Sequence, residues 1–412
     1  MENVSSSNGL EKYPKLRFPG FDEPWQSTLL SSVFAKNIKK NTDGQITNVI
    51  CNSAKQGLIP QREYFDKDIA NSDNTSGYYI IEENDFVYNP RKSTDAPYGP
   101  ISSYKYAEAG IVSPLYLCFR AKKEINPVFF EWYFRSSVWH RYVYMSGDSG
   151  ARHDRVSIKD DTFFAMPINL PSAHEQEHIA SFLQRIDQRI EMQRSLVDNL
   201  KKYKRGLLFR EFGSDVRSET NCEFVGKIKD FFHLSSGSTP SSTNKAFYSG
   251  NIKWVSSGEL KPKHLKETIQ HISGEAVDKF HLREYPANTL LIAMYGLEAA
   301  GVRGTASILS VPATISQACM AIQQAGGIDI EYLYYWYIYN GQWIGIRIAQ
   351  GTKQQNLSTE TLGSLKICAP SYIKQKEVCK VLSQIDKRIE AEERMIDFLS
   401  FFKEGLMQQL FI

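Results

Sequence analysis

The chain has 412 residues, 42% hydrophobic and 23% charged, the proportions of an ordinary folded protein, which excludes a disordered or low-complexity chain. Lys and Arg number 49 and Asp and Glu 46, so the formal net charge of +3 neither indicates nor excludes a polyanionic partner. Its most apolar stretch, 332–339, is far shorter than the roughly 20 residues of a membrane-spanning helix, and the N-terminus lacks the apolar run of a signal peptide. We therefore expect a cytoplasmic protein.

An internal repeat divides the chain into four segments. Residues 171–212 align without a gap with 370–411, at an offset of 199, and both contain the motif Ile-Asp-x-Arg-Ile-Glu. The predicted plan is a variable domain, a helix, a second variable domain and a second helix. The boundaries are 1–170, 171–212, 213–369 and 370–412.

Each repeated segment is predicted to be one long helix. Apolar residues recur at alternating spacings of four and three over 179–207 and 378–406, the pattern of a coiled-coil seam. Ser172 and Glu175 form a capping-box pattern at the start of the first helix. Polar residues interrupt both seams at equivalent places: Gln193 and Glu392, and Lys204 and Lys403. The pattern favours antiparallel pairing of the two helices with each other. The alternative is that each helix packs only on its own domain.

The repeat extends upstream of both helices. Residues 150–157 (GARHDRVS) match 351–358 (GTKQQNLS), and 128–139 match 332–343. In the second match Trp132 is in step with Trp336, and Trp139 with Trp343. Aromatic residues in these segments are candidates for base-stacking platforms. Because they recur in both halves, packing of a helix on a sheet is the favoured interpretation.

The six cysteines include no Cys-x-x-Cys pair, the spacing typical of zinc and redox sites. In a reducing compartment, isolated cysteines behave as small core residues. The sequence therefore predicts neither a disulfide nor a zinc framework.

Short motifs occur in a fixed order in both halves. The first half contains LRFPGF and Trp25 (16–25), NDFVYNPRK (84–92), GIVSPLY (110–116) and GARHDRVS; the second contains SSGSTPSSTNKAFYSGNIKWVSSGELK (235–261), NTLLIAMYG (288–296), SQACMAI (316–322) and GTKQQNLS. Both halves then run into the repeated helix. In this duplicated order the chain resembles the specificity subunit of type I restriction–modification systems.

The resemblance implies a mixed α/β fold, with two α/β target recognition domains separated by a long antiparallel two-helix coiled coil and related by a pseudo-two-fold repeat. Each domain would read one half of an asymmetric, bipartite site on double-stranded DNA, and the helices would dock two methyltransferase (modification) subunits. Those subunits would carry S-adenosylmethionine, and restriction/translocase subunits would use ATP and Mg. The chain itself would be a non-catalytic subunit with no cofactor and no metal.

Three short motifs suggest enzymes instead. Residues 174–178 match the HExxH signature of zinc proteases, but the other repeat has Ile373 and Glu377 at the histidine positions. Residues 147–150 (GDSG) resemble a serine-protease loop without a recognisable histidine partner. Glu259-Leu-Lys261 lacks the upstream Pro-Asp of a nuclease. The alternatives are a zinc-dependent protease or nuclease, or a coiled-coil adaptor without DNA readout.

DNA contacts are expected from polar, basic and aromatic residues in turn-rich segments, because phosphate contacts need cations and base contacts need side chains that reach base edges. The candidates in the first domain are Lys36, Arg62, Asn89, Arg91, Lys92, Tyr98 and Arg152. Those in the second domain are Ser238, Thr239, Ser257, Lys261, Tyr295, Lys353 and Gln354.

Overall fold

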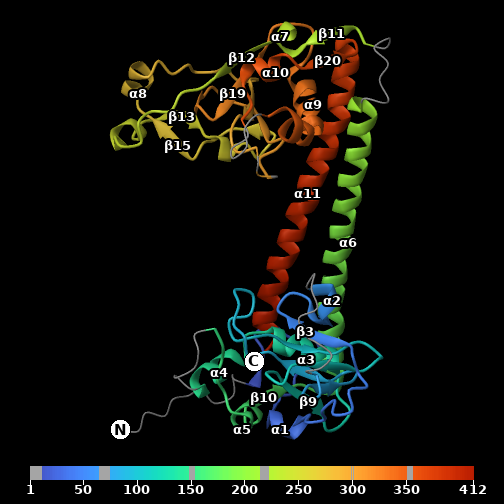
Figure 1. Cartoon of the computed structure of the whole chain (residues 1–412). Coiled ribbons are helices and arrows are strands. Elements are labelled where there is room, and N and C mark those ends of the chain that lie inside the picture. Colours follow the sequence, from blue (N-terminus) through green and yellow to red (C-terminus); the bar gives the residue numbers. More distant parts are fainter. Residues whose placement is uncertain are drawn as a thin grey trace, which may run out of the picture. The chain divides into compact units, whose positions relative to one another are not determined.

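The computed structural model describes residues 12–64, 75–147, 154–213, 222–297, 299, 301–349 and 356–412. The chain divides into two compact units: unit 1 comprises Met1–Gln193 and Met395–Ile412, and unit 2 comprises Arg194–Arg394. Each unit mixes strands with helices (Figure 1). No helix in the described ranges is long and apolar enough to cross a membrane.

Unit 1 contains a strand pair and two four-stranded sheets. The pair is β1 (Gln26–Leu29) with β10 (Pro167–Leu170). One sheet has the order β2 (Phe34–Lys36), β9 (Leu117–Ala121), β6 (Phe86–Tyr88), β7 (Ile101–Ser103); the other has β4 (Gly57–Pro60), β3 (Val49–Ser53), β8 (Gly110–Val112), β5 (Tyr79–Ile81). The short helices are α1 (Leu30–Val33), α2 (Gln61–Tyr64), α3 (Pro127–Arg135), α4 (His140–Ser146) and α5 (Asp160–Phe164). Aromatic residues of α3 pack on the first sheet, Phe130 on Phe34 and Phe134 on Phe86.

Unit 2 pairs β11 (Phe224–Lys227) with β20 (Lys366–Ala369). Its larger sheet has the order β12 (Phe232–Ser236), β19 (Cys319–Gln324), β16 (Leu290–Ala293), β17 (Ala306–Leu309), β14 (His264–Leu265); its smaller sheet has β15 (Gln270–Ile272), β13 (Ile252–Val255), β18 (Thr314–Ile315). The helices are α7 (Ile228–Phe231), α8 (Gly274–Lys279), α9 (Ile330–Trp343) and α10 (Thr359–Gly363), with short turns η4 (Lys245–Tyr248), η5 (Ser257–Glu259) and η6 (Ile344–Ile348). Helix α9 shares one core cluster with the larger sheet.

The two units repeat one topology even where their sequences do not resemble each other. The order β2-β9-β6-β7 of unit 1 recurs as β12-β19-β16-β17 in unit 2. The parallel pair β3–β8 recurs as β13–β18, and an antiparallel strand lies beside it in both units. The structure therefore extends the repeat from the helices through both variable domains.

The predicted match of the tryptophans is wrong by one position. Asn126 caps the start of α3 and Asp329 caps the start of α9, so Trp132 corresponds to Tyr335 and not to Trp336. Trp139 is buried, whereas Trp343 is 49% exposed. Aromatic residues crowd both helices, so an alignment shifted by one residue still pairs ring with ring.

The two long helices are α6 (Ala173–Phe212) and α11 (Tyr372–Leu410), close to the predicted bounds. Within unit 1, Lys403 of α11 donates to Asp187 of α6 at 2.7 Å. Within unit 2, Lys204 of α6 lies 2.5 Å from Asp386 of α11. Each predicted seam lysine therefore meets the aspartate of the Ile-Asp-x-Arg-Ile-Glu motif on the other helix.

The predicted capping box at the start of α6 is only half formed. The Ser172 hydroxyl accepts from the Glu175 amide at 3.2 Å, as a capping box requires. The Glu175 carboxylate, however, accepts two hydrogen bonds from Arg17, both at 2.8 Å, instead of turning back to the helix start. A tertiary ion pair thus replaces the second half of the local motif.

Cys222 and Cys368 form a disulfide, with their Cα atoms 5.8 Å apart. The expectation that the sequence contains no disulfide is therefore wrong. Cys368 lies in β20, and the antiparallel pairing of β20 with β11 brings the segment before β11 beside it. The two residues are 146 positions apart, so no local spacing indicates the pair.

Candidate nucleic-acid interface

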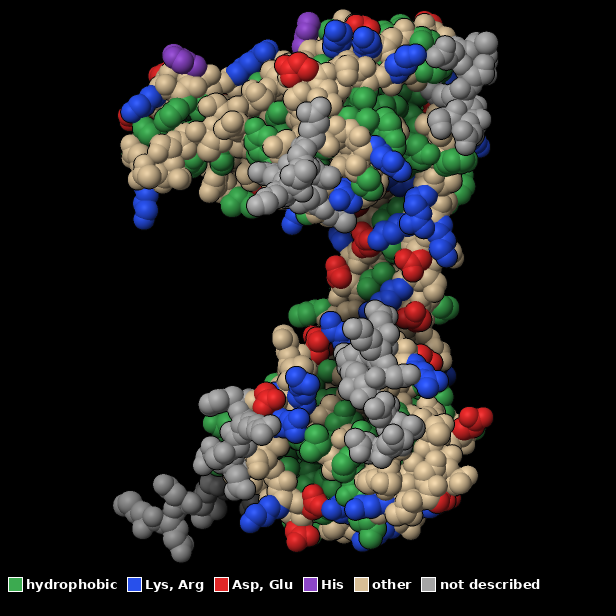
Figure 2. All heavy atoms as spheres, in the orientation of Figure 1, with side chains coloured by type: hydrophobic (Ala, Val, Ile, Leu, Met, Phe, Trp, Pro, Cys, Tyr) green, Lys and Arg blue, Asp and Glu red, His purple; other side chains and the backbone are tan. Residues whose placement is uncertain are grey.

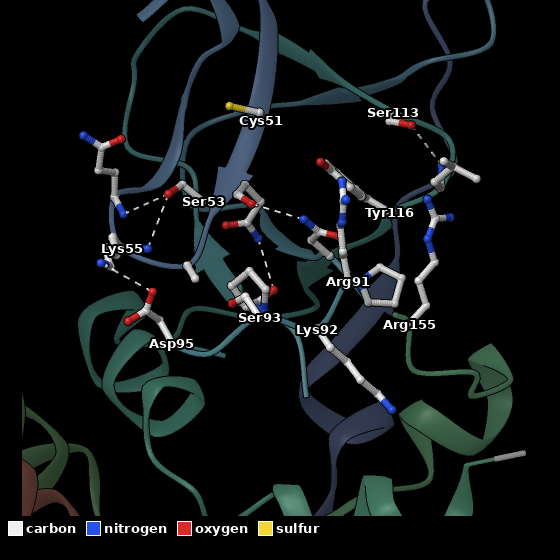
Figure 3. A pocket seen from close by; sticks show the side chains of 17 residues that line it. Cys51, Ser53, Lys55, Arg91, Lys92, Ser93, Asp95, Ser113, Tyr116 and Arg155 are labelled. Carbon is white, nitrogen blue, oxygen red and sulfur yellow. Dashed lines mark hydrogen bonds and ion pairs between the residues drawn. The ribbon is translucent and has the colours of Figure 1, made fainter. Parts of the chain in front are cut away.

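On the face drawn in Figure 2, basic and acidic side chains lie interspersed over both units. The formal net charge is only +3, so affinity for a polyanion must come from local sites. A pocket of about 880 Å³ opens in unit 1 where β3, β6 and β8 end (Figure 3). It is lined by Cys51, Asn52, Ser53, Ala54, Lys55, Gln56, Asn89, Pro90, Arg91, Lys92, Ser93, Asp95, Pro100, Ser113, Leu115, Tyr116 and Arg155. Four of these residues are basic and one is acidic, so the lining is electropositive.

A buried polar framework forms one wall of this pocket. The side-chain amide nitrogen of Asn52 donates to the Val87 carbonyl at 2.7 Å. Its side-chain oxygen accepts from the Ser102 hydroxyl at 2.8 Å. The side-chain amide nitrogen of Asn89 donates to the backbone carbonyl of Asn52 at 3.2 Å. Its side-chain oxygen accepts from the backbone amide of Arg91 at 3.1 Å. The amide groups of both asparagines are engaged within the protein, so Asn89 acts on the pocket by positioning Arg91.

Arg91 and Arg155 face each other across a short antiparallel pairing. The amide of Lys92 donates to the Asp154 carbonyl at 2.9 Å, and the amide of Val156 donates to the Pro90 carbonyl at 2.8 Å. These bonds flank the arginines, which therefore form a non-hydrogen-bonded pair, the kind in which opposed side chains are closest.

Like charges directly opposite each other destabilise a strand pair. Neither Arg91 nor Arg155 forms an ion pair with a residue in the described part of the chain, and Arg155 Nε is buried without a hydrogen-bond partner there. Burial raises the pKa of the Tyr116 phenol and of the Cys51 thiol, so both neighbours remain neutral near pH 7. The pocket thus keeps two adjacent guanidinium groups for a ligand rich in acceptors or negative charge.

Unit 2 builds the same frame with different side chains. The amide of Leu357 donates to the Met294 carbonyl at 2.8 Å, which is the counterpart of one of the two bonds that flank the arginine pair. Tyr295 and Asn356 therefore occupy the places of Arg91 and Arg155. The Tyr295 ring is half-buried and packs against the core of unit 2, and Asn356 is exposed.

Two further candidates in unit 2 lie at the end of β18. The Ser238 amide donates to the Ile315 carbonyl at 3.2 Å, and the Thr239 hydroxyl accepts from the Gln317 amide at 3.1 Å. A Cβ atom at Gly237 would lie 2.2 Å from the Ile315 carbonyl oxygen, so this close approach requires glycine. These residues lie beside the end of β18, the strand that corresponds to β8, and β8 borders the pocket of unit 1.

Ser257 and Lys261 lie just beyond β13, the counterpart of β3. Between them, Glu259 is buried; its carboxylate accepts from both the amide and the hydroxyl of Ser256 at 2.8 Å and from the Ile269 amide at 2.6 Å. This carboxylate fixes a turn, which argues against the nuclease interpretation of Glu259-Leu-Lys261.

Three further candidates in the described part of unit 1 do not line the pocket. Lys36 is held by Asp160 at 2.5 Å, an ion pair that raises the pKa of the lysine. The Tyr98 ring packs against His140 with ring centroids 4.6 Å apart, and Arg62 lies exposed on α2. Arg152, Lys353 and Gln354, as well as Ser149 of the GDSG motif, lie outside the described residues.

The HExxH motif is assembled differently from a zinc-protease site. His174 and His178 are exposed and close, with their Nε2 atoms 3.2 Å apart. Glu175, which would be the general base of a protease, is 1% exposed and is held by both hydrogen bonds from Arg17. Both carboxylate oxygens of Glu175 already accept from Arg17, so Glu175 ties the start of α6 to Arg17.

A cluster in unit 2 has the composition of a metal site. Asp329, Glu331 and Cys379 bring their ligand atoms within 4.8 Å of one another. Lys376, however, lies 2.6 Å from Asp329, and Lys263 pairs with Glu331 and donates to Tyr335. Burial raises the pKa of the Cys379 thiol. Lys376 of α11 and Lys263 thus pair with the two carboxylates at the start of α9, so each carboxylate already has a cation.

Sequence reasoning missed two of the four pocket cations, Lys55 and Arg155. Arg155 belongs to the repeated GARHDRVS segment, so that repeat was a usable signal. Lys55 lies in the turn between β3 and β4, where Gly57 has a φ of +71°. A Lys-Gln-Gly turn between two strands is common on any protein surface, so it gave no signal.

Comparison with known proteins identifies the family. The family model described as type I restriction modification DNA specificity domain matches residues 24–202 and again 221–399. Over 192 residues the chain is 29% identical to the type I restriction enzyme MjaIX specificity subunit of Methanocaldococcus jannaschii, covering 46% of this chain and 43% of the relative. Over 171 residues it is 26% identical to the EcoR124I/EcoR124II specificity subunit of Escherichia coli, covering 41% of each. The chain thus spans about two-fifths of the length of the curated relatives it matches.

Solved structures extend the likeness of fold to nearly the whole chain. A chain from a study of complex assembly and conformational transition in a type I R-M system matches with a TM-score of 0.63 at 14% identity, covering 96% of this chain and 98% of that one. The type I S subunit from M. genitalium matches with a TM-score of 0.57 at 14% identity, covering 97% and 99%. The HsdS subunit from Thermoanaerobacter tengcongensis matches with a TM-score of 0.52 at 15% identity, covering 96% and 97%. The chain belongs to the type I restriction–modification DNA specificity family and carries its specificity domain twice.

Proposed function

We propose that this chain is the DNA-binding specificity subunit of a type I restriction–modification complex and reads an asymmetric bipartite site. The observation that carries the proposal is the facing pair Arg91 and Arg155, which lies in an electropositive pocket without a carboxylate partner among the described residues. Its place within a domain of the DNA specificity family makes double-stranded DNA the ligand that fits.

In this proposal each unit contacts one half of the site through the loops at the ends of equivalent strands. Exposed cations such as Lys55 and Lys92 contact phosphates, which positions the unit without reading sequence. Side chains on the pocket wall reach base edges in the major groove. Because the equivalent loops carry different side chains in the two units, the two half-sites differ.

The proposal assigns the two long helices to spacing and docking. They pair as an antiparallel coiled coil between recognition domains at 1–170 and 213–369, supported by the Lys403–Asp187 and Lys204–Asp386 pairs. Two methyltransferase subunits dock on these helices and bring S-adenosylmethionine, and restriction/translocase subunits bring ATP and Mg. This chain catalyses no reaction itself, holds no cofactor and acts in the cytoplasm.

Mapping of methylated adenines tests this function. The full chain is expressed with its methyltransferase partner in a host without adenine methylation, and modified adenines are located across the genome. The expected result is a motif of two different short blocks with a fixed gap. Adenine methylation without such a motif would contradict the proposal.

A pair of variants ties the test to the pocket. The double substitution Arg91→Ala and Arg155→Ala is expected to abolish methylation at most sites, since both opposed cations are removed. Lys123→Ala, which removes an exposed cation of unit 1 outside the pocket, is the matched control and should leave the methylation pattern unchanged.

A further inference from the structure

Arg155 differs from the other pocket cations in how its side chain is held. It is half-buried, and its Nε is buried without a hydrogen-bond partner in the described part of the chain. The end of the stem is therefore enclosed by protein, and the two terminal amino groups are the donors left for a ligand. Figure 3 shows Arg91 and Arg155 extending toward the side of the pocket where Ser113 and Tyr116 lie.

The two amino groups of a guanidinium lie in one plane and suit a planar pair of acceptors. Guanine presents O6 and N7 together in the major groove, and an arginine fork binds both at once. The exposed Arg91 and Lys92 supply the cations that phosphates need, and Lys55 lies 3.5 Å from Asp95 at the same pocket. A phosphate is bound by any exposed cation nearby, so it does not require a half-buried arginine such as Arg155.

The counterpart of Arg155 in unit 2 has a different chemistry. The shared bond between Leu357 and Met294 places Asn356 at the equivalent position. An asparagine amide donates one hydrogen bond and accepts another, which matches N7 and N6 of adenine and not the two acceptors of guanine. The two units therefore differ in the base they suit at one structurally equivalent point.

We infer that Arg155 reads a guanine in the half-site bound by unit 1, and that unit 2 makes no arginine–guanine contact at the equivalent position. This inference rests on the proposed function and deepens it, since it assigns one base to one half-site. It requires that the half-site of unit 1 contain at least one guanine whose N7 and O6 face the major groove unobstructed.

The test uses duplex oligonucleotides that carry the mapped site, with each guanine in turn replaced by 7-deazaguanine, which lacks the N7 acceptor. Binding to the full chain with its methyltransferase subunits is measured by fluorescence anisotropy. One replacement in one half-site should weaken wild-type binding by about 10-fold, as expected for half of a bidentate contact. The same replacement should not weaken binding to Arg155→Ala any further.

Two controls separate base reading from charge. Arg155→Lys keeps the cation but loses the fork, so it should retain the salt dependence of binding and lose the sensitivity to 7-deazaguanine. Asn356→Ala should leave the effect of each 7-deazaguanine replacement on binding unchanged. Thermal unfolding of each variant checks the fold, which Arg155→Ala should leave intact because Arg155 Nε has no partner to lose in the described part of the chain.

Other outcomes overturn the inference. One such outcome is a mapped site without guanine. Another is a site at which no 7-deazaguanine replacement weakens binding by the wild type. A third is a replacement whose effect is lost in Asn356→Ala and not in Arg155→Ala. In those cases selective binding to the mapped site would still support the proposed function. Failure of the proposed function is a different result, in which no sequence-selective binding or methylated motif is found.

Discussion

Units 1 and 2 repeat one backbone plan but differ in where they place charge. At the seam of the long helices they agree, because each seam lysine meets an aspartate of the other helix and lies near the aromatic ring of an equivalent residue, Trp132 in unit 1 and Tyr335 in unit 2. At the strand ends they disagree, because unit 1 has two opposed arginines where unit 2 has Tyr295 and Asn356. The repeat therefore determines the backbone arrangement, and the side chains at equivalent strand ends differ and can specify a ligand.

The sheet interiors show the same contrast, and the largest expected effect tests it. Asp85 of unit 1 is fully buried and accepts from Arg120 at 2.6 and 2.7 Å. Its counterpart in unit 2 is Thr289. The Asp85 carbonyl accepts from the Tyr104 amide, and the Thr289 carbonyl accepts from the Leu309 amide at the matching place. Asp85→Ala removes a buried carboxylate that also accepts from Asn37 and from the Glu82 amide, and should cost about 3 kcal/mol of unfolding free energy. Thr289→Ala removes one neutral hydrogen bond and should cost about 1 kcal/mol.

Hydrogen exchange resolved by peptide, on the full chain in increasing urea, measures the two costs separately. Asp85→Ala should destabilise unit 1 and leave the exchange of β16 and β19 in unit 2 unchanged. Equal costs for the two substitutions would mean that Asp85 and Thr289 are not different solutions to the same position.

The second prediction concerns the seam, where the units agree in plan and differ in burial. Asp386 is 14% exposed, lies 2.5 Å from Lys204 and accepts from the Tyr335 hydroxyl at 2.7 Å. Asp187 is 37% exposed and bonds Lys403. Asp386→Ala should therefore cost about 2 kcal/mol, and Asp187→Ala about 1 kcal/mol or less because water screens the pair.

Urea unfolding of the full chain tests this order. Asp397→Ala is the matched control, since Asp397 lies exposed on the same helix α11 as Asp386 and should change stability very little. Exchange of the charges between Lys204 and Asp386 should recover part of the loss. No recovery, together with equal losses at Asp187 and Asp386, would refute the equivalence of the two pairs.

The third prediction concerns the strand ends, where the units differ most. Arg91→Ala should lower the slope of log affinity against log salt by about 1, the effect of losing one phosphate contact. Tyr295→Ala, at the equivalent place in unit 2, removes no charge and should leave that slope unchanged. The measurement is a salt titration of DNA binding by the complete complex, with Lys123→Ala as control. An unchanged slope for Arg91→Ala would remove Arg91 from the phosphate contacts.

The features that could be predicted from the sequence are those with a local or repeated signal. The long helices follow from a seam with spacings of four and three, and their seam lysines occur at matching places in both copies. The family follows from short motifs in a duplicated order. The aromatic segments also gave the correct packing role, although their alignment between the halves was one residue out.

The features that could not be predicted depend on contacts between distant residues. The opposition of Arg91 and Arg155 exists only because a loop 64 residues further along the chain pairs with the end of β6. The Cys222–Cys368 disulfide and the Arg17–Glu175 pair join residues 146 and 158 positions apart. No periodicity reports such pairings, so the sequence indicated candidate residue types and the fold decided which of them meet.

The smallest expected effect distinguishes the units by pH. Burial lowers the pKa of His140 in unit 1. In unit 2 the pKa of His264 is lowered mainly by burial and secondly by the positive charge of Lys263. In both cases the unfolded chain binds the proton more readily, so stability is lost as pH falls below the unfolded pKa of about 6.5. Salt should weaken this loss in unit 2, where a charge contributes, and leave it in unit 1, where the lowering comes from burial alone.

Peptide-resolved hydrogen exchange between pH 8 and pH 5.5, at low and high salt, separates these two causes. His140→Phe should remove the pH dependence of unit 1 only, since the phenyl ring keeps the ring contact with Tyr98 and carries no titrating group. His264→Gln should remove that of unit 2 only. A pH dependence of unit 1 that disappears in high salt would mean that a neighbouring charge, and not burial, controls His140.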